Sequence, residues 1–362
     1  MTEPLQPGTT IGILGGGQLG RMLSLAASQL GMRTHIFCPD PDSPAFDVTA
    51  HKTVAGYDDV AALRAFSGGV DVVTYEFENV PVATAKVIAD HTVLYPGTRA
   101  LEVSQDRLIE KRFLTHNGIA VAPYRAVRSH EELDAAIAEI GLPAVLKTTR
   151  LGYDGKGQRT LRTPADAEAA FDALSGVDLV LEGFIAFERE ISVIVVRGAD
   201  GNAVTYDPAE NVHRDHILKT STLPATLSSQ AARSAQAMAI EIADALDYVG
   251  TMGVEFFVVS DGEAPRLLVN EIAPRVHNSG HWTQAVCVTD QFENHIRAIC
   301  GWPLGDTTRL ADVVMENLIG DEVFATSRAV SQPGTQPHVY GKAEARAGRK
   351  MGHLNRVSLA KG

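Results

Sequence analysis

Two glutamates in the second half of the chain are spaced so that their carboxylates could share a metal ion. Glu255 and Glu271 lie in the apolar runs GVEFFVV and RLLVNEIAPR, which flank the turn segment SDGEAP. In an unbulged hairpin that turns at Glu263, they lie directly opposite each other, on the face that carries Phe257, Val259, Leu267 and Val269. Opposed carboxylates repel by up to about 1 kcal/mol, and Mg²⁺, which prefers carboxylate oxygens, turns that repulsion into attraction. The spacing predicts a magnesium site, with Asn270 on the opposite face; the alternative is a solvated edge hairpin, which the apolar neighbours disfavour.

Hydrogen-bond donors crowd into the segment APRVHNSGHWT, directly after the second of these glutamates. Arg275, His277 and Asn278 could hold a small oxyanion beside a magnesium–phosphate site. His277 and His281 also have the i,i+4 spacing of zinc ligands on a helix. No glutamate follows His277, however, and the sequence Asn-Ser-Gly disfavours a helix there. We therefore predict an oxyanion site rather than a zinc site.

A glycine-rich loop in the segment LKTTRLGYDGKGQRTL could bind phosphate. Lys147 ends an apolar run, and Gly152, Gly155 and Gly157 punctuate the following loop, which also contains Lys156. Glycines let backbone amides approach an anion closely, and lysines supply point charges for phosphate oxygens. The spacing does not match the G-x-x-x-x-G-K-[ST] phosphate loop. On this segment alone, an ordinary hairpin loop with surface lysines is an equal alternative.

A second glycine turn occurs near the N-terminus, in IGILGGGQLGRM. Gly15, Gly17 and Gly20 have G-x-G-x-x-G spacing between a predicted strand and helix, and Asp40 follows about 20 residues later, where a dinucleotide-binding domain places its ribose ligand. A nicotinamide oxidoreductase is therefore one interpretation. The N-terminus of a helix suits the phosphate of any nucleotide equally well, so the turn by itself does not identify the ligand.

The elements that must position these residues change in character along the chain. Apolar runs alternate with amphipathic segments through the first hundred residues, which predicts a doubly wound parallel sheet. The predicted strands are 11–14, 34–38 and 70–75, and the predicted helices are 18–30, 58–66, 81–89, 104–116, 129–140 and 228–246. From residue 180 the strands follow one another in an antiparallel pattern. The fold class is therefore mixed, α/β at the N-terminus and α+β beyond it.

Composition narrows the class of protein. A chain of 362 residues, 45% of them hydrophobic, is long enough for two or three domains. A formal net charge of −12 without a Lys/Arg block disfavours nucleic acid as a partner. The sequence has no apolar run of about 18 residues and no signal-peptide pattern, so we expect no membrane association and a cytoplasmic location. Cys38, Cys287 and Cys300 lack disulfide or metal spacing, and no G-x-S-x-G elbow supports a serine nucleophile.

Six motifs in order make the chain similar to the ATP-grasp superfamily and, within it, to the 5-(carboxyamino)imidazole ribonucleotide synthase family. They are GGGQLGRM, YEFEN, SQDR, GYDGKGQ, NEIAPRVHNSGHWT, and YGK with RKMGH, and they span residues 11–353. The resemblance implies a Rossmann-like pre-ATP-grasp domain at 1–103, an ATP-grasp lid at 104–185, a larger ATP-grasp part with the metal site at 186–306 and a small β-rich domain at 307–362. It also implies ATP and magnesium as cofactors and a homodimer that acts on small molecules.

The resemblance further implies a role for each matching residue. Magnesium would lie on Glu255 and Glu271, and bicarbonate would contact Arg275, His277 and Asn278. The residues implied to bind ATP are Arg107, Lys147, Gly152, Tyr153, Asp154, Gly155, Lys156, Gly157, Gln158, Glu182, Gly183, Phe184, Ile185, Glu190, His213, Asn270 and Glu271. Those implied to bind 5-aminoimidazole ribonucleotide are Gly17, Gln18, Leu19, Glu76, Tyr153, Asp154, Lys342 and Arg349, with the first glycine turn at its 5'-phosphate. Tyr153, Asp154 and Lys342 join the three bicarbonate residues in the implied catalytic set, in which Asp154 orients or deprotonates the amine. Asp40 is then a turn residue.

The implied reaction is the ATP-dependent carboxylation of 5-aminoimidazole ribonucleotide by bicarbonate, through carboxyphosphate, in purine biosynthesis. Three alternatives remain at this point. One is the related ATP-grasp ligase that joins formate to glycinamide ribonucleotide, which the endings HNSGHWT and RKMGH disfavour. The others are a nicotinamide oxidoreductase and a catalytically silent nucleotide-binding protein.

Overall fold

The computed structural model describes residues 3–152, 157–174, 176–260 and 265–358. Its N-terminal part is a five-stranded parallel sheet with strand order β3-β2-β1-β4-β5. The strands are β1 (Thr10–Leu14), β2 (Arg33–Phe37), β3 (His51–Thr53), β4 (Val72–Tyr75) and β5 (Val93–Leu94), and the connecting helices are α1 (Gln18–Gln29), η1 (Pro44–Val48), α2 (Val60–Ser67) and α3 (Val82–Ala89). The predicted doubly wound sheet is confirmed. Its strand order reverses between β1 and β4, the position at which such sheets bind ligands.

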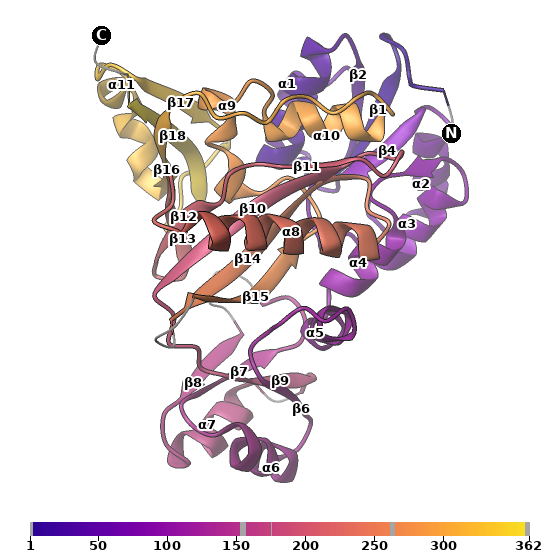
Figure 1. Cartoon of the computed structure of the whole chain (residues 1–362). Helices are drawn as coiled ribbons and strands as arrows, with labels where there is room; N and C mark the ends of the chain where they lie inside the picture. Colours follow the sequence, from indigo (N-terminus) through magenta and orange to yellow (C-terminus); the bar gives the residue numbers. More distant parts are fainter. Residues whose placement is uncertain (1–2, 153–156, 175, 261–264, 359–362) are drawn as a thin grey trace.

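A second, antiparallel sheet forms a small separate layer at the bottom of Figure 1. Its strand order is β6-β9-β7-β8, and two helices cover one face. The elements are β6 (Tyr124–Val127), α6 (His130–Ile140), β7 (Ala144–Thr148), β8 (Gln158–Leu161), α7 (Ala165–Leu174) and β9 (Leu179–Gly183). We call this layer the lid sheet.

The largest sheet has nine strands and forms the body of the molecule. Its order is β15-β14-β10-β12-β13-β16-β18-β17, with β11 paired to β10. The strands are β10 (Arg189–Arg197), β11 (Ala203–Thr205), β12 (Ala209–Arg214), β13 (Ile217–Leu223), β14 (Gly250–Val259), β15 (Arg266–Ala273), β16 (Asp312–Ile319), β17 (Thr335–Val339) and β18 (Lys350–Ser358). Because β13 pairs with β16, the C-terminal strands continue this sheet instead of forming one of their own.

Six helical elements among the described residues connect and cover the strands of this central sheet. They are α8 (Ser229–Ala245), η2 (Asn278–Gly280), α9 (Thr283–Val286), α10 (Gln291–Ile299), η3 (Gly320–Ala325) and α11 (Thr326–Ala329). No helix in the described ranges is long and apolar enough to cross a membrane.

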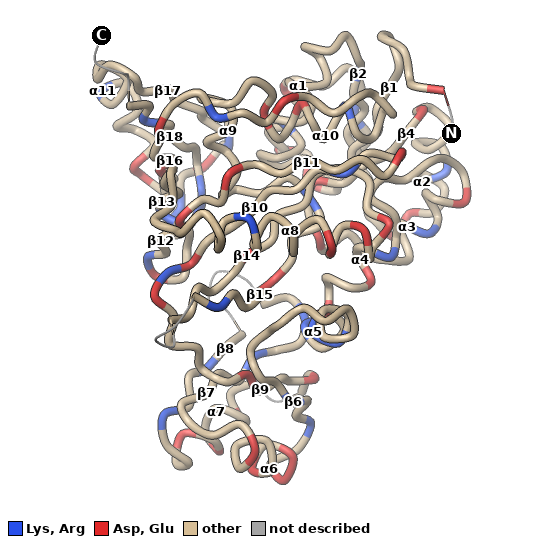
Figure 2. Tube along the Cα trace, in the orientation of Figure 1, with Lys and Arg blue, Asp and Glu red and all other residues tan. Residues whose placement is uncertain are grey.

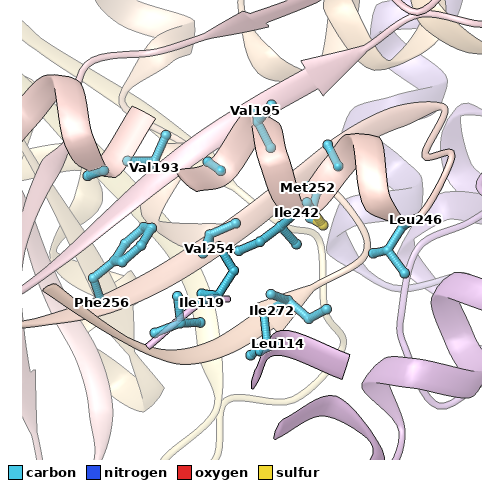
Figure 3. Close-up of a cluster of buried hydrophobic side chains, with 14 of the residues drawn as sticks. Leu114, Ile119, Val193, Val195, Ile242, Leu246, Met252, Val254, Phe256 and Ile272 are labelled. Atoms are coloured by element: carbon cyan, nitrogen blue, oxygen red, sulfur yellow. The ribbon is translucent and has the colours of Figure 1, made fainter. Parts of the chain in front are cut away.

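The main core lies between α8 and the central sheet (Figure 3). Ile242 of α8 meets Val193, Met252 and Val254, and all four side chains are buried. Burying one such side chain fully contributes roughly 1.5–3 kcal/mol. Small residues repeat along the buried face of α8, at Ala231, Ala235, Ala239 and Ala243, and let the helix approach the sheet closely. This packing holds β14 and β15 in place from behind, and leaves their other face to the functional site.

The prediction of one helix over residues 104–116 is wrong at its start, because the chain is not helical at Gln105 and Asp106. α4 (Thr98–Ser104) ends before Gln105, and α5 (Arg107–His116) begins after Asp106. The carboxylate of Asp106 accepts hydrogen bonds from the amides of Leu108 at 3.0 Å and Ile109 at 3.2 Å, so it caps a new helix. The break directs α5 across the gap between the lid sheet and the central sheet (Figure 1).

Candidate active site

A cleft of about 970 Å³ lies between the lid sheet and the central sheet. That volume is in the range of pockets that hold a nucleotide-sized ligand. The predicted site residues that line it are Arg107, Lys147, Gly152, Gln158, Phe184, Glu190, His213, Glu255, Asn270, Glu271, Arg275, His277 and Asn278. These residues come from six separate stretches of sequence, so the fold brings together the predicted nucleotide, metal and oxyanion groups.

Glu255 and Glu271 are cross-strand partners on β14 and β15, as predicted. The unbulged register behind that prediction is wrong, however, because the pairing shifts by one residue between Glu255 and Phe256. Phe257 pairs with Leu268 instead of Val269. The extra residue on β15 is Asn270.

The bulge changes which side chains of β15 reach the cleft. Leu267, Val269 and Ile272 all join the core behind the sheet. Strict alternation cannot place all three on one face, but one inserted residue between positions 269 and 272 does so. Asn270 and Glu271 therefore both line the cleft. The prediction that Asn270 points to the opposite face is wrong.

The two opposed carboxylates fit a divalent cation. Burial, and then the neighbouring Glu271, raise the pKa of Glu255. Two ion-pair contacts that these carboxylates form with described residues are long, since Arg107 Nη1 is 3.8 Å from Glu271 Oε2 and His277 Nε2 is 3.7 Å from Glu255 Oε1. Within the described residues no group of three or more His, Cys, Asp or Glu could hold a metal ion. Two carboxylates completed by phosphate oxygens and water are the ligands that Mg²⁺ takes beside a nucleotide.

Three charges, two of them buried, support the floor of the cleft on the lid side. Lys147 Nζ on β7 donates to Glu182 Oε2 on β9 at 3.0 Å, and Lys111 Nζ on α5 lies 3.3 Å from Glu182 Oε1. Burial alone would raise the pKa of Glu182, but Lys147 and then Lys111 lower it to about 2. Burial lowers the pKa of Lys147. Lys147 also lines the cleft.

Lys111 is a site residue that the sequence analysis missed. Basic residues are visible on α5 in Figure 2, and their sequence, RLIEKRF, is that of an ordinary amphipathic helix. Only the tertiary fold buries one of its lysines against Glu182. Glu110, the preceding residue, was missed for the same reason. Its Oε1 accepts a hydrogen bond from the amide of Ile272 at 2.6 Å and so ties α5 to the strand that carries Glu271.

The opposite end of the cleft has the features of a nucleoside site. His213 Nδ1 and Glu190 Oε2 are hydrogen-bonded at 2.7 Å. Burial would lower the pKa of His213, but Glu190 raises it. Phe187 stacks on Phe257 with ring centroids 4.8 Å apart, and both rings line the cleft with Phe184. Aromatic faces beside a carboxylate suit a base and its ribose hydroxyls.

Part of the predicted phosphate loop falls outside the described residues, namely Tyr153, Asp154, Gly155 and Lys156. At its edges, Gly152 O accepts a hydrogen bond from Arg107 Nη2 at 2.9 Å. Gly157 has φ +69°, a conformation that glycine adopts readily. Gly183 is the last residue of β9 and Ile185 follows the strand, and neither lines the cleft.

The N-terminal glycine turn is held by a carboxylate of the chain itself. Glu76 Oε1 accepts from the amide of Gly17 at 2.6 Å, and its Oε2 accepts from Gly20 at 3.0 Å. Glu76 therefore occupies the amide of Gly17, which the resemblance placed at the ribonucleotide. Asp40 Oδ1 accepts from the amide of Asp42 at 3.0 Å in an exposed turn.

Lys342 and Arg349 approach this turn from the C-terminal segment. Lys342 Nζ donates to Lys350 O at 2.7 Å, and Arg349 Nη1 donates to Glu344 O at 3.0 Å. Burial, and then Arg349, lower the pKa of Lys342 to about 8, while Glu76 acts in the opposite direction. The fold thus brings the charges of Arg349 and Glu76 close enough to Lys342 to act on it. Lys350 of β18, which the sequence analysis also missed, lines the main cleft.

The predicted oxyanion donors each have a partner that fixes them. Arg275 forms an ion pair with Glu78, with Arg275 Nη2 donating to Glu78 Oε1 at 3.1 Å. Asn278 and Asn317 exchange two side-chain hydrogen bonds, at 2.9 and 2.8 Å. Glu78 lies in the motif YEFEN and was within reach of sequence reasoning, whereas Asn317 of β16 had no signal.

The structure places His277 and His281, which have the i,i+4 spacing of zinc ligands on a helix, in different surroundings. His277 and His281 flank the short 3-10 turn η2 and do not share an α-helix. His281 is fully buried, and its Nδ1 is 3.0 Å from Gln291 Nε2. Burial, and then Arg275, hold the pKa of His277 well below its usual value. His277 therefore presents a neutral imidazole to the cleft.

A cleft between two antiparallel sheets, with a lysine on one sheet and two opposed glutamates on the other, is the arrangement of an ATP-grasp enzyme. Family models agree with this class. The ATP-grasp domain matches residues 112–292, the ribonucleotide synthetase preATP-grasp domain matches 8–105, and the phosphoribosylaminoimidazole carboxylase C-terminal domain matches 313–361.

Whole-chain comparisons specify the family. The chain is 52% identical over 355 residues to an N5-carboxyaminoimidazole ribonucleotide synthase of Brucella melitensis, covering 98% of this chain and 97% of that one. It is 43% identical to the enzyme of the same name from Bacillus subtilis, with 97% and 92% covered. The chain belongs to the N5-carboxyaminoimidazole ribonucleotide synthase family of ATP-grasp ligases.

Solved structures of the same family share the fold. An ADP complex of an N5-carboxyaminoimidazole ribonucleotide synthetase superposes with a TM-score of 0.95 at 44% identity, covering 99% of this chain and 94% of that one. The Aspergillus clavatus synthase in complex with ADP and 5-aminoimidazole ribonucleotide superposes with a TM-score of 0.91 at 31% identity, with 98% and 95% covered. These matches confirm the predicted fold class and family.

Proposed function

We propose that the chain uses ATP and bicarbonate to carboxylate 5-aminoimidazole ribonucleotide, and releases ADP and phosphate. Membership of the family supports the reaction. The observation that carries it within this molecule is the cross-strand pair Glu255–Glu271, which faces Lys147 across one cleft. A catalytically silent nucleotide-binding protein would have no reason to keep two carboxylates opposed in its cleft.

The cleft supplies binding for both the nucleotide and a metal ion. Lys147 would contact phosphate oxygens, and Glu190 with His213 would hold the ribose. Glu255 and Glu271 would hold a magnesium ion which, when bound, supplies positive charge against the phosphates of ATP. Asn270 shares their face of the hairpin because of the bulge, so its amide is available to the same phosphates.

Carboxyl transfer would then proceed in two displacements. An oxygen of bicarbonate attacks the γ-phosphorus of ATP, and the bond to the bridging oxygen breaks to release ADP. The exocyclic amine next attacks the carbonyl carbon of carboxyphosphate, phosphate leaves, and the amine loses a proton. Arg275, His277 and Asn278 converge where the oxyanion forms and would stabilise it. Asp154 remains the proposed group for orienting or deprotonating the amine.

The ribonucleotide would lie between the cleft and the N-terminal sheet. Lys342 and Arg349 supply positive charge there for a phosphate, and Gln18 and Leu19 supply amides at the start of α1. The domain limits implied by the resemblance, and a cytoplasmic homodimer, belong to the same proposal. Light scattering on the purified protein tests the dimer.

The proposal is tested by measuring ADP release with each substrate omitted in turn. ADP should appear only when bicarbonate and 5-aminoimidazole ribonucleotide are both present. Release with formate and glycinamide ribonucleotide in their place would support the related formate ligase instead. Glu271→Gln should abolish release, whereas Glu241→Gln, an exposed glutamate on α8, should leave it unchanged. Full turnover by Glu271→Gln would remove the metal-site argument.

A further inference from the structure

We propose that a buried chain of hydrogen bonds ending at Ser279 fixes His277 as the tautomer that carries its hydrogen on Nε2, so that His277 serves the reaction as a neutral hydrogen-bond donor. This inference rests on the proposed function, and it assigns positioning roles to Ser279, Ser192 and Asn211. None of these three residues was singled out by motif or spacing.

The chain of hydrogen bonds has one direction from β13 to the cleft. Ser221 Oγ donates to Asn211 Oδ1 at 2.7 Å, and Asn211 Nδ2 donates to Ser192 Oγ at 3.0 Å. Ser192 Oγ then donates to Ser279 Oγ at 2.6 Å. Each of these side chains is buried, at 5% exposure or less. A hydroxyl has one hydrogen to donate, so Ser279, having accepted from Ser192, directs its own hydrogen to His277 Nδ1, which is 2.8 Å away.

The backbone supplies a second reason for the same tautomer. The amide of Ser279 points at His277 Nδ1 from 3.4 Å. This contact is long, but an amide nitrogen can only donate. A hydrogen on Nδ1 would therefore face both the amide hydrogen and the hydroxyl hydrogen of Ser279. The long amide contact is the weaker of the two, so the direction of the Ser279 hydroxyl decides. With that hydroxyl donating, Nδ1 accepts, and the hydrogen of the neutral ring is on Nε2.

The ring is held so that Nε2 faces the cleft. The His277 side chain packs on Gly253, where an added Cβ would lie only 2.7 Å from His277 Cβ. Gln291 holds the backbone on both sides, accepting from His277 N at 2.9 Å and donating to His277 O at 2.8 Å. Nε2 then lies 3.7 Å from Glu255 Oε1, at the edge of the metal site. A donor in this position suits an oxygen of bicarbonate or carboxyphosphate beside the metal-bound phosphates.

The direction of the chain can be reversed by one nearly isosteric substitution. Asn211→Asp removes the Nδ2 donor and places an acceptor opposite Ser192. Ser192 then donates to residue 211 and accepts from Ser279, and Ser279 accepts from Nδ1. The hydrogen of His277 moves to Nδ1, and the donor in the cleft is lost. Ser279→Ala breaks the same chain at its last link.

The tautomer is measured directly by nitrogen-15 NMR of the protein labelled at histidine, with His277 assigned from the spectrum of His277→Gln. In the unsubstituted protein we expect a hydrogen on Nε2 and none on Nδ1. Asn211→Asp should show a hydrogen on Nδ1, and Ser279→Ala should show a mixture. The matched control is Ser67→Ala, because Ser67 is buried but donates only to Leu63 O of its own helix; it should leave the His277 signals unchanged.

Kinetics test the use of the tautomer in the reaction. Both variants should lower kcat by at least about tenfold, as loss of a correctly oriented imidazole tautomer does elsewhere. The KM for ATP should stay within about twofold. A hydrogen on Nδ1 in the unsubstituted protein overturns the proposal, and so does a changed tautomer with unchanged turnover. Absence of bicarbonate-dependent turnover in the unsubstituted protein would instead refute the proposed function, while the NMR result still decides the tautomer.

Discussion

Glu182 supports the lid side of the cleft through charge, and replacing it by glutamine should destabilise the protein strongly. The carboxylate is 4% exposed and lies between Lys147 and Lys111. Glu182→Gln keeps the shape of the side chain but leaves two ammonium groups without a counter-charge. The loss of one partner from a buried ion pair typically costs about 3–5 kcal/mol.

The pKa of Glu182 gives a second route to the same magnitude. The lysines lower it from 4.5 to about 2 against the opposing effect of burial. At roughly 1.4 kcal/mol per pKa unit, this corresponds to about 3 kcal/mol of free energy of unfolding. Because the pKa is lower in the folded state, the contribution is complete above about 4.5 and is lost as the pH falls toward about 2. The difference between the native sequence and the variant should therefore narrow in acid.

Urea denaturation near neutral pH, followed by circular dichroism, measures the effect. Both tryptophans, Trp282 and Trp302, lie outside the lid sheet, so separate fluorescence and dichroism transitions would show the lid unfolding first. Glu139→Gln is the matched control, since Glu139 pairs with Arg125 in the same lid but on the exposed surface. A loss below about 1 kcal/mol in Glu182→Gln, or an equal loss in the control, would refute the assignment of a stabilising triad.

Three further predictions concern other parts of the molecule. The affinity for the phosphate of 5-aminoimidazole ribonucleotide should fall as the pH rises through about 8, where Lys342 loses its charge; a KM that stays constant across this range would contradict the role of Lys342. Gly253→Ala should push His277 out of position because of the 2.7 Å contact of the added Cβ, so bicarbonate-dependent turnover should fall while ADP binding, measured by calorimetry, persists. Asp106→Ala should cost about 1 kcal/mol of unfolding free energy through loss of the α5 cap, and an unchanged urea midpoint would show that the cap is replaced.

Much of the fold was available from local patterns. The alternation of apolar runs and amphipathic segments predicted the parallel N-terminal sheet. The equal distances of Glu255 and Glu271 from the turn between them predicted that they pair. The predicted helices at 129–140 and 228–246 are confirmed, and the side chains of Ser129 and Ser228 cap them. These features depend on residues a few positions apart, or on one turn, so the sequence contains what is needed to infer them. The family resemblance added residue roles that spacing alone could not assign.

The errors in the predicted hairpin register and in the predicted helix start arose where a single residue decides the direction of the chain or of its side chains. A single bulge at Asn270 turned that residue toward the cleft and moved Val269 to the core. Strand register has a period of two, so one inserted residue exchanges the faces beyond it. No pattern in the segment RLLVNEIAPR shows where such an insertion falls. Similarly, Asp106 reads equally well as an interior helix residue and as a cap, and packing of α5 between two sheets decided in favour of the cap.

The sequence by itself determined the types of element, the likeness to a family and the acids that could hold a metal ion. Tertiary structure alone decided which residues far apart in the sequence form ion pairs or hydrogen bonds with each other. Lys111 and Glu182 form an ion pair although they are 71 positions apart in the sequence. Ser192 is linked to His277 by hydrogen bonds through Ser279. Burial turns such contacts into strong ones, because an ion or a hydrogen bond away from water has no alternative partner. Which groups become buried together depends on the packing of whole sheets, and no local pattern records it.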